Sequence, residues 1–252
     1  MNDHLDKYQN IKEYIADKEN IFRFQKAGDV VVLNWDNQYT RKMGDKIRNQ
    51  IIWFSLKKHL PKWVLLEKVK LLGEHNLANA LAAALAAESA GVSRQDILSV
   101  LRTFRGLPNR LELIRTIRGV KYYNDTTATT PDATIAALKT LSKIKNIILI
   151  AGGADKKLEY KGLAEYIKRY CKAVILLPGA ATPKIKLDIG YWILDIKKAG
   201  NMHEAVNLAR KIAKRGDIVL LSPAAASFGL FKNEFDRGEE FKRIVKKFNK
   251  IM

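Results

Sequence analysis

Short apolar segments that alternate with helical patterns fill the second half of the sequence and most constrain its fold. Runs of four or five apolar residues lie within 146–152, 173–178 and 218–222. Apolar residues at helical spacing occupy 160–170, 202–214 and 238–248. Strands that are apolar along their whole length are buried on both faces, as in a parallel sheet covered by helices. The pattern therefore predicts an α/β fold with a doubly wound, mostly parallel sheet.

The first half carries a different arrangement of elements. Its patterns predict a helix over 11–24, strands over 29–35 and 51–56, and helices over 75–90 and 93–101. Gly106 and Pro108 then interrupt the pattern at 104–109, which is the best domain boundary. Beyond it, a hairpin is expected over 111–123 and a helix over 131–141. We divide the chain into domains 1–106 and 107–252.

Composition excludes several classes of protein. A single cysteine, Cys171, rules out a disulfide framework and a multi-cysteine zinc site, and it fits a reducing cytoplasm. The polar first residues are not a secretory signal, and no apolar run approaches the roughly 18 residues of a membrane helix. We therefore expect a cytoplasmic protein with no membrane partner.

Net charge leaves one alternative open. The chain has 45 Lys and Arg against 26 Asp and Glu, a formal charge of +19, which suits a nucleic-acid partner. Basic residues nevertheless come singly or in pairs, without a known nucleic-acid-binding motif. We interpret the excess as a lysine-rich surface compatible with anionic substrates, and we expect no specific nucleic acid.

Three loops that follow predicted strands have a composition suited to ligand binding. The loop 123–131 holds four threonines and Asp125, 151–156 holds two glycines and Lys156, and 222–238 begins with small residues and Ser227. Ligands of parallel α/β sheets bind at the carboxyl ends of strands, where such loops meet. Each loop taken alone is explained equally well as a helix cap, a simple turn or a connector between helices.

Weaker signals lie in the first half. Asn76 and Asn79 are three residues apart and share one face of a predicted helix, where two amides could meet a base such as adenine. Asn76 could equally be a helix cap. His4 and Lys18 are, taken alone, ordinary surface residues.

Taken together and in order, these segments resemble the Mur ligases, and most closely the branch that adds D-glutamate. The resemblance is carried by DHLDKY (3–8), Tyr14 with Lys18, GEHNLANALAAA (73–84), FRGLPNRLE (104–112), YYNDTTATTPDATIAAL (122–138), AGGADK (151–156) and LLSPAAASFGLFKNEFDRGEEF (220–241). It implies that 1–106 is the rear part of an α/β central ATPase domain and 107–252 a Rossmann-like C-terminal domain.

The implied reaction is an ATP-dependent amide ligation in peptidoglycan precursor synthesis. ATP would phosphorylate the carboxylate of UDP-MurNAc-L-alanine, and the amine of D-glutamate would attack the acyl phosphate. The resemblance implies Mg²⁺ as a further cofactor, with His4 and Lys18 as catalytic, metal-binding residues, Lys18 after carbamylation.

The resemblance also implies two sets of binding residues. For the nucleotide these are Asn76, Asn79, Arg110 and Asp125. For D-glutamate they are Thr129, Lys156, Ser227 and the segment 231–235, in which Phe235 is the first candidate for the aromatic that lines the pocket and Phe231 the alternative. Two positions depart from the family pattern. Thr127 stands where a lysine is usual, and Glu234 precedes Phe235 where the order is usually reversed.

The sequence also contains no G-x-x-x-x-G-K-[ST] phosphate loop. We therefore expect the chain to start inside the central domain and to be inactive alone. The alternatives are a non-catalytic nucleotide- or ligand-binding module, or half of a split ligase that pairs with a separately encoded N-terminal piece.

Overall fold

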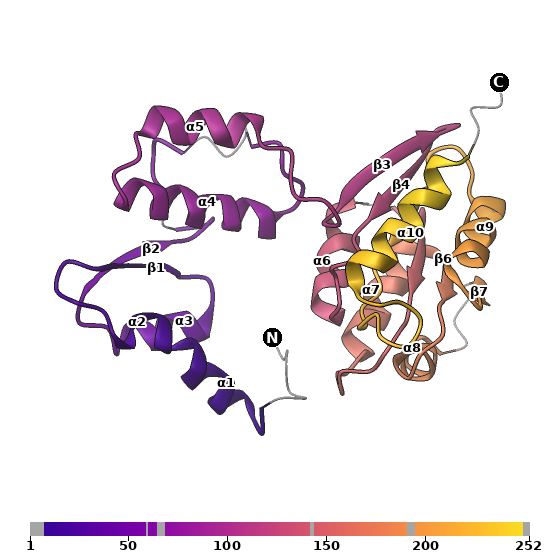
Figure 1. The fold of residues 1–252 in the computed structure, drawn as a ribbon, viewed down its shortest axis with the longest axis horizontal. Helices are drawn as coiled ribbons and strands as arrows, with labels where there is room; N and C mark the ends of the chain where they lie inside the picture. The colour runs from indigo at the N-terminus through magenta and orange to yellow at the C-terminus, as the bar shows by residue number, and fades with distance from the viewer. Residues whose placement is uncertain (1–7, 59, 65–68, 142–143, 191–194, 249–252) are drawn as a thin grey trace. The chain divides into compact units, whose positions relative to one another are not determined.

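A computed structural model describes residues 8–58, 60–64, 69–141, 144–190 and 195–248. The described residues form two compact units, one up to Arg105 and the other from Gly106 onward. Figure 1 shows the elements of both units along the chain. Within the described residues, no helix is long and apolar enough to cross a membrane.

The first unit contains a small parallel sheet and five helices among its described residues. The elements are α1 (Ile11–Lys18), α2 (Asn20–Arg23), β1 (Val30–Asn34), α3 (Gln38–Gly44), β2 (Gln50–Phe54), α4 (Glu74–Ser89) and α5 (Arg94–Thr103). β1 pairs with β2 in parallel. Phe54 at the end of β2 packs with Leu81 and Leu85 of α4, which fixes that helix against the sheet.

Most sequence predictions for this unit are confirmed, with one correction. Ser93 caps α5 by accepting a hydrogen bond from the Asp96 amide, as its spacing predicts. Gly91, at φ +87°, follows the end of α4. The single helix expected over 11–24 is instead divided at Glu19 into α1 and α2. Neither piece has a buried residue, so no packing holds one continuous helix there.

The second unit is built on a six-stranded sheet in the order β3-β4-β8-β5-β6-β7. Its strands are β3 (Glu112–Ile117), β4 (Val120–Asn124), β5 (Ile147–Ala151), β6 (Cys171–Leu176), β7 (Asp195–Lys198) and β8 (Ile218–Leu221). β3 and β4 form the expected antiparallel hairpin, and all other pairs are parallel. β5 and β8 are buried at every position, which confirms the reading of their apolar runs.

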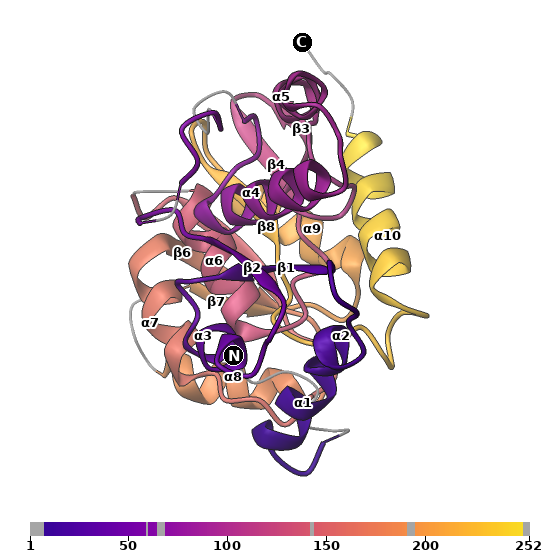
Figure 2. The ribbon, with the colours of Figure 1, turned by 90° about the vertical axis from the view of Figure 1, so that its left-hand side faces the viewer.

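Helices cover both faces of this sheet. They are α6 (Pro131–Leu141), α7 (Lys161–Tyr170), α8 (Ala181–Ile189), α9 (Met202–Ile212) and α10 (Glu234–Lys246). One core lies under α6, α7 and α8 and includes Leu138 and Leu163; the other lies under α9 and α10 and includes Val206 and Phe241. Figure 2 shows α7 and α10 on opposite sides of the sheet.

Three features of the second unit were not expected from the sequence. α8 contains Pro183, and β7, with sequence DIKK, is an edge strand, so neither shows a clean apolar period. The closing helix begins at Glu234 rather than 238, because Asn233 caps it by accepting a hydrogen bond from the Asp236 amide.

Two glycines after β5 are required by the closeness of neighbouring backbone. Gly153 has φ +140°, and a Cβ added there would lie 2.2 Å from the Ala226 carbonyl oxygen. A Cβ on Gly152 would lie 2.6 Å from the Leu177 carbonyl oxygen. The space that a side chain would need is therefore filled by neighbouring loops.

We predict that Gly153→Ala lowers the free energy of unfolding by at least about 2 kcal/mol, because the backbone of 225–226 must move and φ is strained. Gly162→Ala is the matched control: it lies in α7 with nothing within 4 Å of its added Cβ, so a gain of about 0.5–1 kcal/mol is expected. Urea unfolding followed by circular dichroism measures both. Equal stability of the two variants would contradict the prediction.

Candidate functional site

The three loops singled out in the sequence meet at one edge of the sheet in the second unit. They follow β4, β8 and β5, which are adjacent strands; Leu221 at the end of β8 pairs with Asn124 at the end of β4 and with Ile150, one residue before the end of β5. Backbone hydrogen bonds join them: the Ala224 amide donates to the Ala128 carbonyl oxygen at 2.9 Å, and the Ala154 and Ala226 amides donate to each other's carbonyl oxygens. We call residues 124–131, 152–157 and 222–231 the three-loop site.

Asp125 is the buried carboxyl group of the three-loop site, with 7% of its surface exposed. It accepts hydrogen bonds from the Leu111 amide at 3.1 Å and from the Ser222 hydroxyl at 2.9 Å. Burial raises the pKa of Asp125 to about 7, although these hydrogen bonds and the nearby Arg110 guanidinium act to lower it. A carboxyl group with this pKa can be protonated or ionised near neutral pH.

Lys156 and Thr129 are brought together from two different loops. The Lys156 ammonium donates to the Thr129 hydroxyl at 3.1 Å, and both side chains are partly exposed. An ammonium and a hydroxyl at the same edge are donors suited to a carboxylate or phosphate. Ser227 lies in the third loop, where it is buried and its carbonyl accepts from the Phe231 amide.

The aromatic residues around this loop have separate environments. Phe231 packs against the core under α9 and α10. Phe235 is 55% exposed and Phe228 is 65% exposed. Phe235 and Phe228 therefore present the free aromatic surface of this segment, and Phe231 stabilises the fold.

Sequence reasoning missed a buried charge beneath the three-loop site. Arg237 is fully buried, and its guanidinium donates to the hydroxyl and carbonyl of Thr126 at 2.9 and 2.8 Å and to the Ala225 carbonyl at 3.2 Å. Burial lowers its pKa to about 10, so it stays cationic at neutral pH. One signal was available: Arg237 shares the helical face of Phe241 and Ile244, which is the buried face.

A second buried network explains the glycine beside that arginine. The side-chain amide of Asn124 donates to the side-chain oxygen of Asn109 at 2.7 Å, and the side-chain oxygen of Asn124 accepts from the backbone amide of Thr126. A Cβ on Gly238 would lie 2.6 Å from the Asn109 oxygen, so α10 can approach only with glycine there. These contacts hold the start of the first loop.

The remaining sequence-predicted residues lie in the first unit or outside the described residues. Asn76 and Asn79 lie three residues apart in α4. The side-chain amide of Asn76 donates to the Leu72 carbonyl oxygen at 2.8 Å, and Asn79 is exposed. Lys18 ends α1, with its ammonium 5.2 Å from the centroid of the Tyr14 ring. His4 lies outside the described residues.

A magnesium centre does not fit the described residues as they stand. Over those parts of the chain, no group of three or more His, Cys, Asp or Glu side chains could hold a metal ion. Lys18 is a cation that lies over an aromatic ring. An unmodified ammonium repels a divalent cation because both are positively charged, and it offers none of the oxygen ligands that Mg²⁺ prefers.

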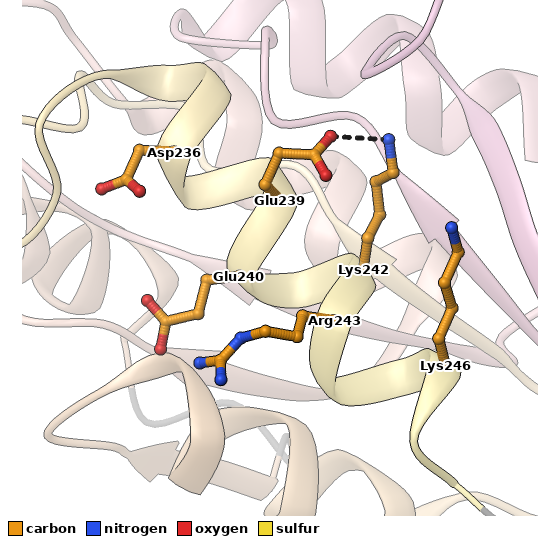
Figure 3. A pocket seen from close by; sticks show the side chains of 6 residues that line it. All are labelled: Asp236, Glu239, Glu240, Lys242, Arg243 and Lys246. Atoms are coloured by element: carbon orange, nitrogen blue, oxygen red, sulfur yellow. Dashed lines mark hydrogen bonds and ion pairs between the residues drawn. The ribbon is translucent and has the colours of Figure 1, made fainter.

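A pocket along α10 is separate from the three-loop site. Figure 3 shows its charged lining, which shares no residue with the three-loop site and comprises Asp236, Glu239, Glu240, Lys242, Arg243 and Lys246. Lys242 is paired with Glu239 at 2.7 Å and with Glu112 at 3.6 Å. Acidic residues lie toward the start of the helix and basic residues toward its end, an order in which the charges interact favourably with the helix dipole and stabilise the helix.

Comparison with known proteins shows the family of the chain. Residues 109–225 match the description "Mur ligase, glutamate ligase domain", and residues 1–87 match "Mur ligase middle domain". The chain belongs to the Mur ligase family. The first two loops of the three-loop site and residues 222–225 of the third lie within the match to the glutamate ligase domain, and α1 to α3 with most of α4 lie within the match to the middle domain.

Curated relatives and solved Mur ligase structures agree with this assignment. A protein of Roseiflexus sp. (strain RS-1) named UDP-N-acetylmuramoylalanine--D-glutamate ligase is 41% identical over 98% of this chain and 59% of its own length. One of Acetivibrio thermocellus with the same name is 39% identical over 96% of this chain and 57% of its own length. The chain thus spans less than two thirds of these relatives.

Structural similarity extends to other Mur ligases. The crystal structure of MurF from Acinetobacter baumannii has a TM-score of 0.71 at 18% identity and covers 97% of this chain and 58% of that one. At this identity the likeness shows the fold, an α/β architecture with a mostly parallel sheet, as the sequence predicts.

The raised pKa of Asp125 makes the stability of this Mur ligase domain depend on pH. Asp125 titrates near pH 4 in an unfolded chain and near 7 in the folded one, so the folded state binds more protons between these values. We predict that the free energy of unfolding falls by about 4 kcal/mol more between pH 4 and 8 in the wild type than in Asp125→Asn.

Hydrogen exchange of the β4 and β8 amides, measured from pH 4 to 8, tests this difference. The asparagine side chain can still accept from the Leu111 amide, so the variant keeps that contact. Parallel pH dependences of the two proteins would contradict a raised pKa for Asp125.

Proposed function

We propose that this chain carries the middle and C-terminal domains of an ATP-dependent ligase that adds D-glutamate to UDP-MurNAc-L-alanine in peptidoglycan precursor synthesis. The observation that supports the proposal is the three-loop site, where loops far apart in the sequence are joined by backbone hydrogen bonds and the Lys156 ammonium donates to the Thr129 hydroxyl. Relatives that are 39 and 41% identical are named for this reaction. The nucleotide and nucleotide-linked substrates place the reaction in the cytoplasm.

Lys156 and Thr129 are the proposed binding groups for D-glutamate. Glutamate is a dianion at its carboxylates, and Lys156 offers a cation beside a hydroxyl at the open edge of the sheet. Ser227, on the adjoining loop, is the proposed third contact. Charge-assisted hydrogen bonds of this kind fix the amino acid and its reacting amine in one orientation.

The chemical step follows from the orientation of that amine. The terminal phosphoryl group of ATP passes to the substrate carboxylate, which becomes an acyl phosphate. The deprotonated amine of D-glutamate then forms a C–N bond to the acyl carbon, and the C–O bond to phosphate breaks. Inorganic phosphate leaves with the electron pair of the broken bond, and the proton that the nitrogen loses passes to the departing phosphate or to water. The proposed contribution of the three-loop site is proximity and orientation.

The nucleotide contacts are proposed for both units. Asp125 and Arg110 would hold the ribose and phosphates, and Asn76 and Asn79 the adenine. One neighbouring solved structure, MurF from Thermotoga maritima in complex with ADP, has a TM-score of 0.68 at 19% identity and covers 97% of this chain and 60% of that one. The Mg²⁺ expected from the family resemblance finds no complete ligand set among the described residues, and the steps above use none.

Binding of D-glutamate tests the amino-acid site directly. Lys156→Ala is expected to weaken D-glutamate affinity by at least about tenfold, because a charge-assisted hydrogen bond contributes about 1.5–3 kcal/mol. Lys157→Ala is the matched control, since Lys157 is the exposed neighbour and its variant keeps Lys156. Isothermal titration with D- and L-glutamate measures both variants.

A ligation assay separates the enzyme from the alternatives. It uses ATP, UDP-MurNAc-L-alanine and D-glutamate, with the chain alone and with the N-terminal segment of a relative added in trans. Product formed only with the added segment supports a split ligase. D-glutamate binding without product in either case supports a ligand-binding module. Failure of wild-type protein to bind D-glutamate would exclude the proposed site.

A further inference from the structure

Asp125 is the first of three buried side chains that are joined in series by hydrogen bonds. Ser222 directly follows β8 and is fully buried, and its hydroxyl lies 2.9 Å from Asp125 Oδ2 and 3.0 Å from Thr134 Oγ1. Thr134, fully buried in the first turn of α6, has its hydroxyl 3.3 Å from the Ser222 carbonyl oxygen. These hydrogen bonds thus connect the loop after β4, the end of β8 and helix α6.

The protons of the three linked side chains can be arranged in two ways, and each way satisfies every donor. Each hydroxyl has one proton to donate. When Asp125 is ionised, Ser222 donates to the carboxylate, and the Thr134 hydroxyl donates to a Ser222 oxygen. When Asp125 is protonated, it donates to Ser222, Ser222 donates to Thr134, and Thr134 donates to the Ser222 carbonyl. No buried donor is left without an acceptor in either state.

We propose that Ser222 is a positioning residue which, together with Thr134, holds the Asp125 carboxyl group in one orientation whether that group is ionised or protonated. The Leu111 amide fixes Oδ1 and Ser222 fixes Oδ2. Each oxygen keeps a lone pair for a ligand hydroxyl. This role rests on the proposed function, in which Asp125 holds the nucleotide.

The two hydroxyls affect the two states of Asp125 in opposite ways. Ser222 stabilises the ionised form most, because hydrogen bonds to a carboxylate are roughly twice as strong as neutral ones. Thr134 stabilises the protonated form, since only then is it the acceptor for Ser222. Arg110 is the charged group that faces Asp125, and it favours the ionised form in every variant considered.

The test is the titration midpoint of the Asp125 carboxyl carbon, followed by NMR on the whole chain without ligand. Ser222→Ala should raise the midpoint by about 1 pH unit through loss of the donor to the carboxylate. Thr134→Val should lower it, because protonated Asp125 then leaves the Ser222 proton without an acceptor. Thr134→Ser keeps the hydroxyl and should restore the wild-type midpoint.

Thr140→Val is the matched control on the same helix. Its hydroxyl donates only to the Ala136 carbonyl of α6, so the variant should leave the midpoint unchanged. A Ser222→Ala midpoint within about 0.3 unit of the wild type, or an upward shift in Thr134→Val, would overturn the proposal. If Ser222→Ala does not fold, the Thr134→Val and Thr134→Ser pair decides it alone.

These measurements need neither nucleotide nor D-glutamate. Opposite shifts in the Ser222 and Thr134 variants together with no binding of ADP would support the orientation of Asp125 and remove its nucleotide role. Binding of ADP with no shift in either variant would do the reverse. The two proposals can therefore fail separately.

Discussion

The buried guanidinium of Arg237 is the interaction on which the three-loop site depends. It comes from α10, yet its donors satisfy Thr126 after β4 and Ala225 after β8. Among the described residues it forms no ion pair; neutral oxygens accept its hydrogen bonds, and the charge of Glu234 also favours its cationic form. A buried cation is costly unless its hydrogen bonds are complete, which ties the positions of both loops to the helix.

The sequence determined the central strands more clearly than the edges. β5 and β8 were predicted because their apolar runs are long enough to be buried on both faces. β7 was missed because an edge strand with two lysines and an aspartate carries no such signal. α1 and α2 were predicted as one helix because apolar period alone does not show whether a helix has a surface to pack on.

Several residues of the candidate site could be predicted from the sequence, but the contacts that hold them in place could not. Asp125, Lys156 and Ser227 could be named because each follows a strand in a loop of unusual composition. Ser222 and Arg237 act through contacts with residues 97 and 111 positions away, and no local pattern encodes such a partner. The glycines after β5 were interpreted as allowing the backbone to approach a ligand closely, or as a simple turn, whereas in the structure the close approach is to the backbone of Leu177 and Ala226.

The position of β8 has a consequence for how the second unit assembles. β8 is the last strand in the sequence, yet it lies between β4 and β5 and pairs with both. During synthesis the hairpin of β3 and β4 and the group of β5, β6 and β7 must wait as two separate half-sheets until residues 218–221 leave the ribosome. The two half-sheets therefore cannot join before residues 218–221 are available, and until then the facing edges of β4 and β5 are exposed to other chains.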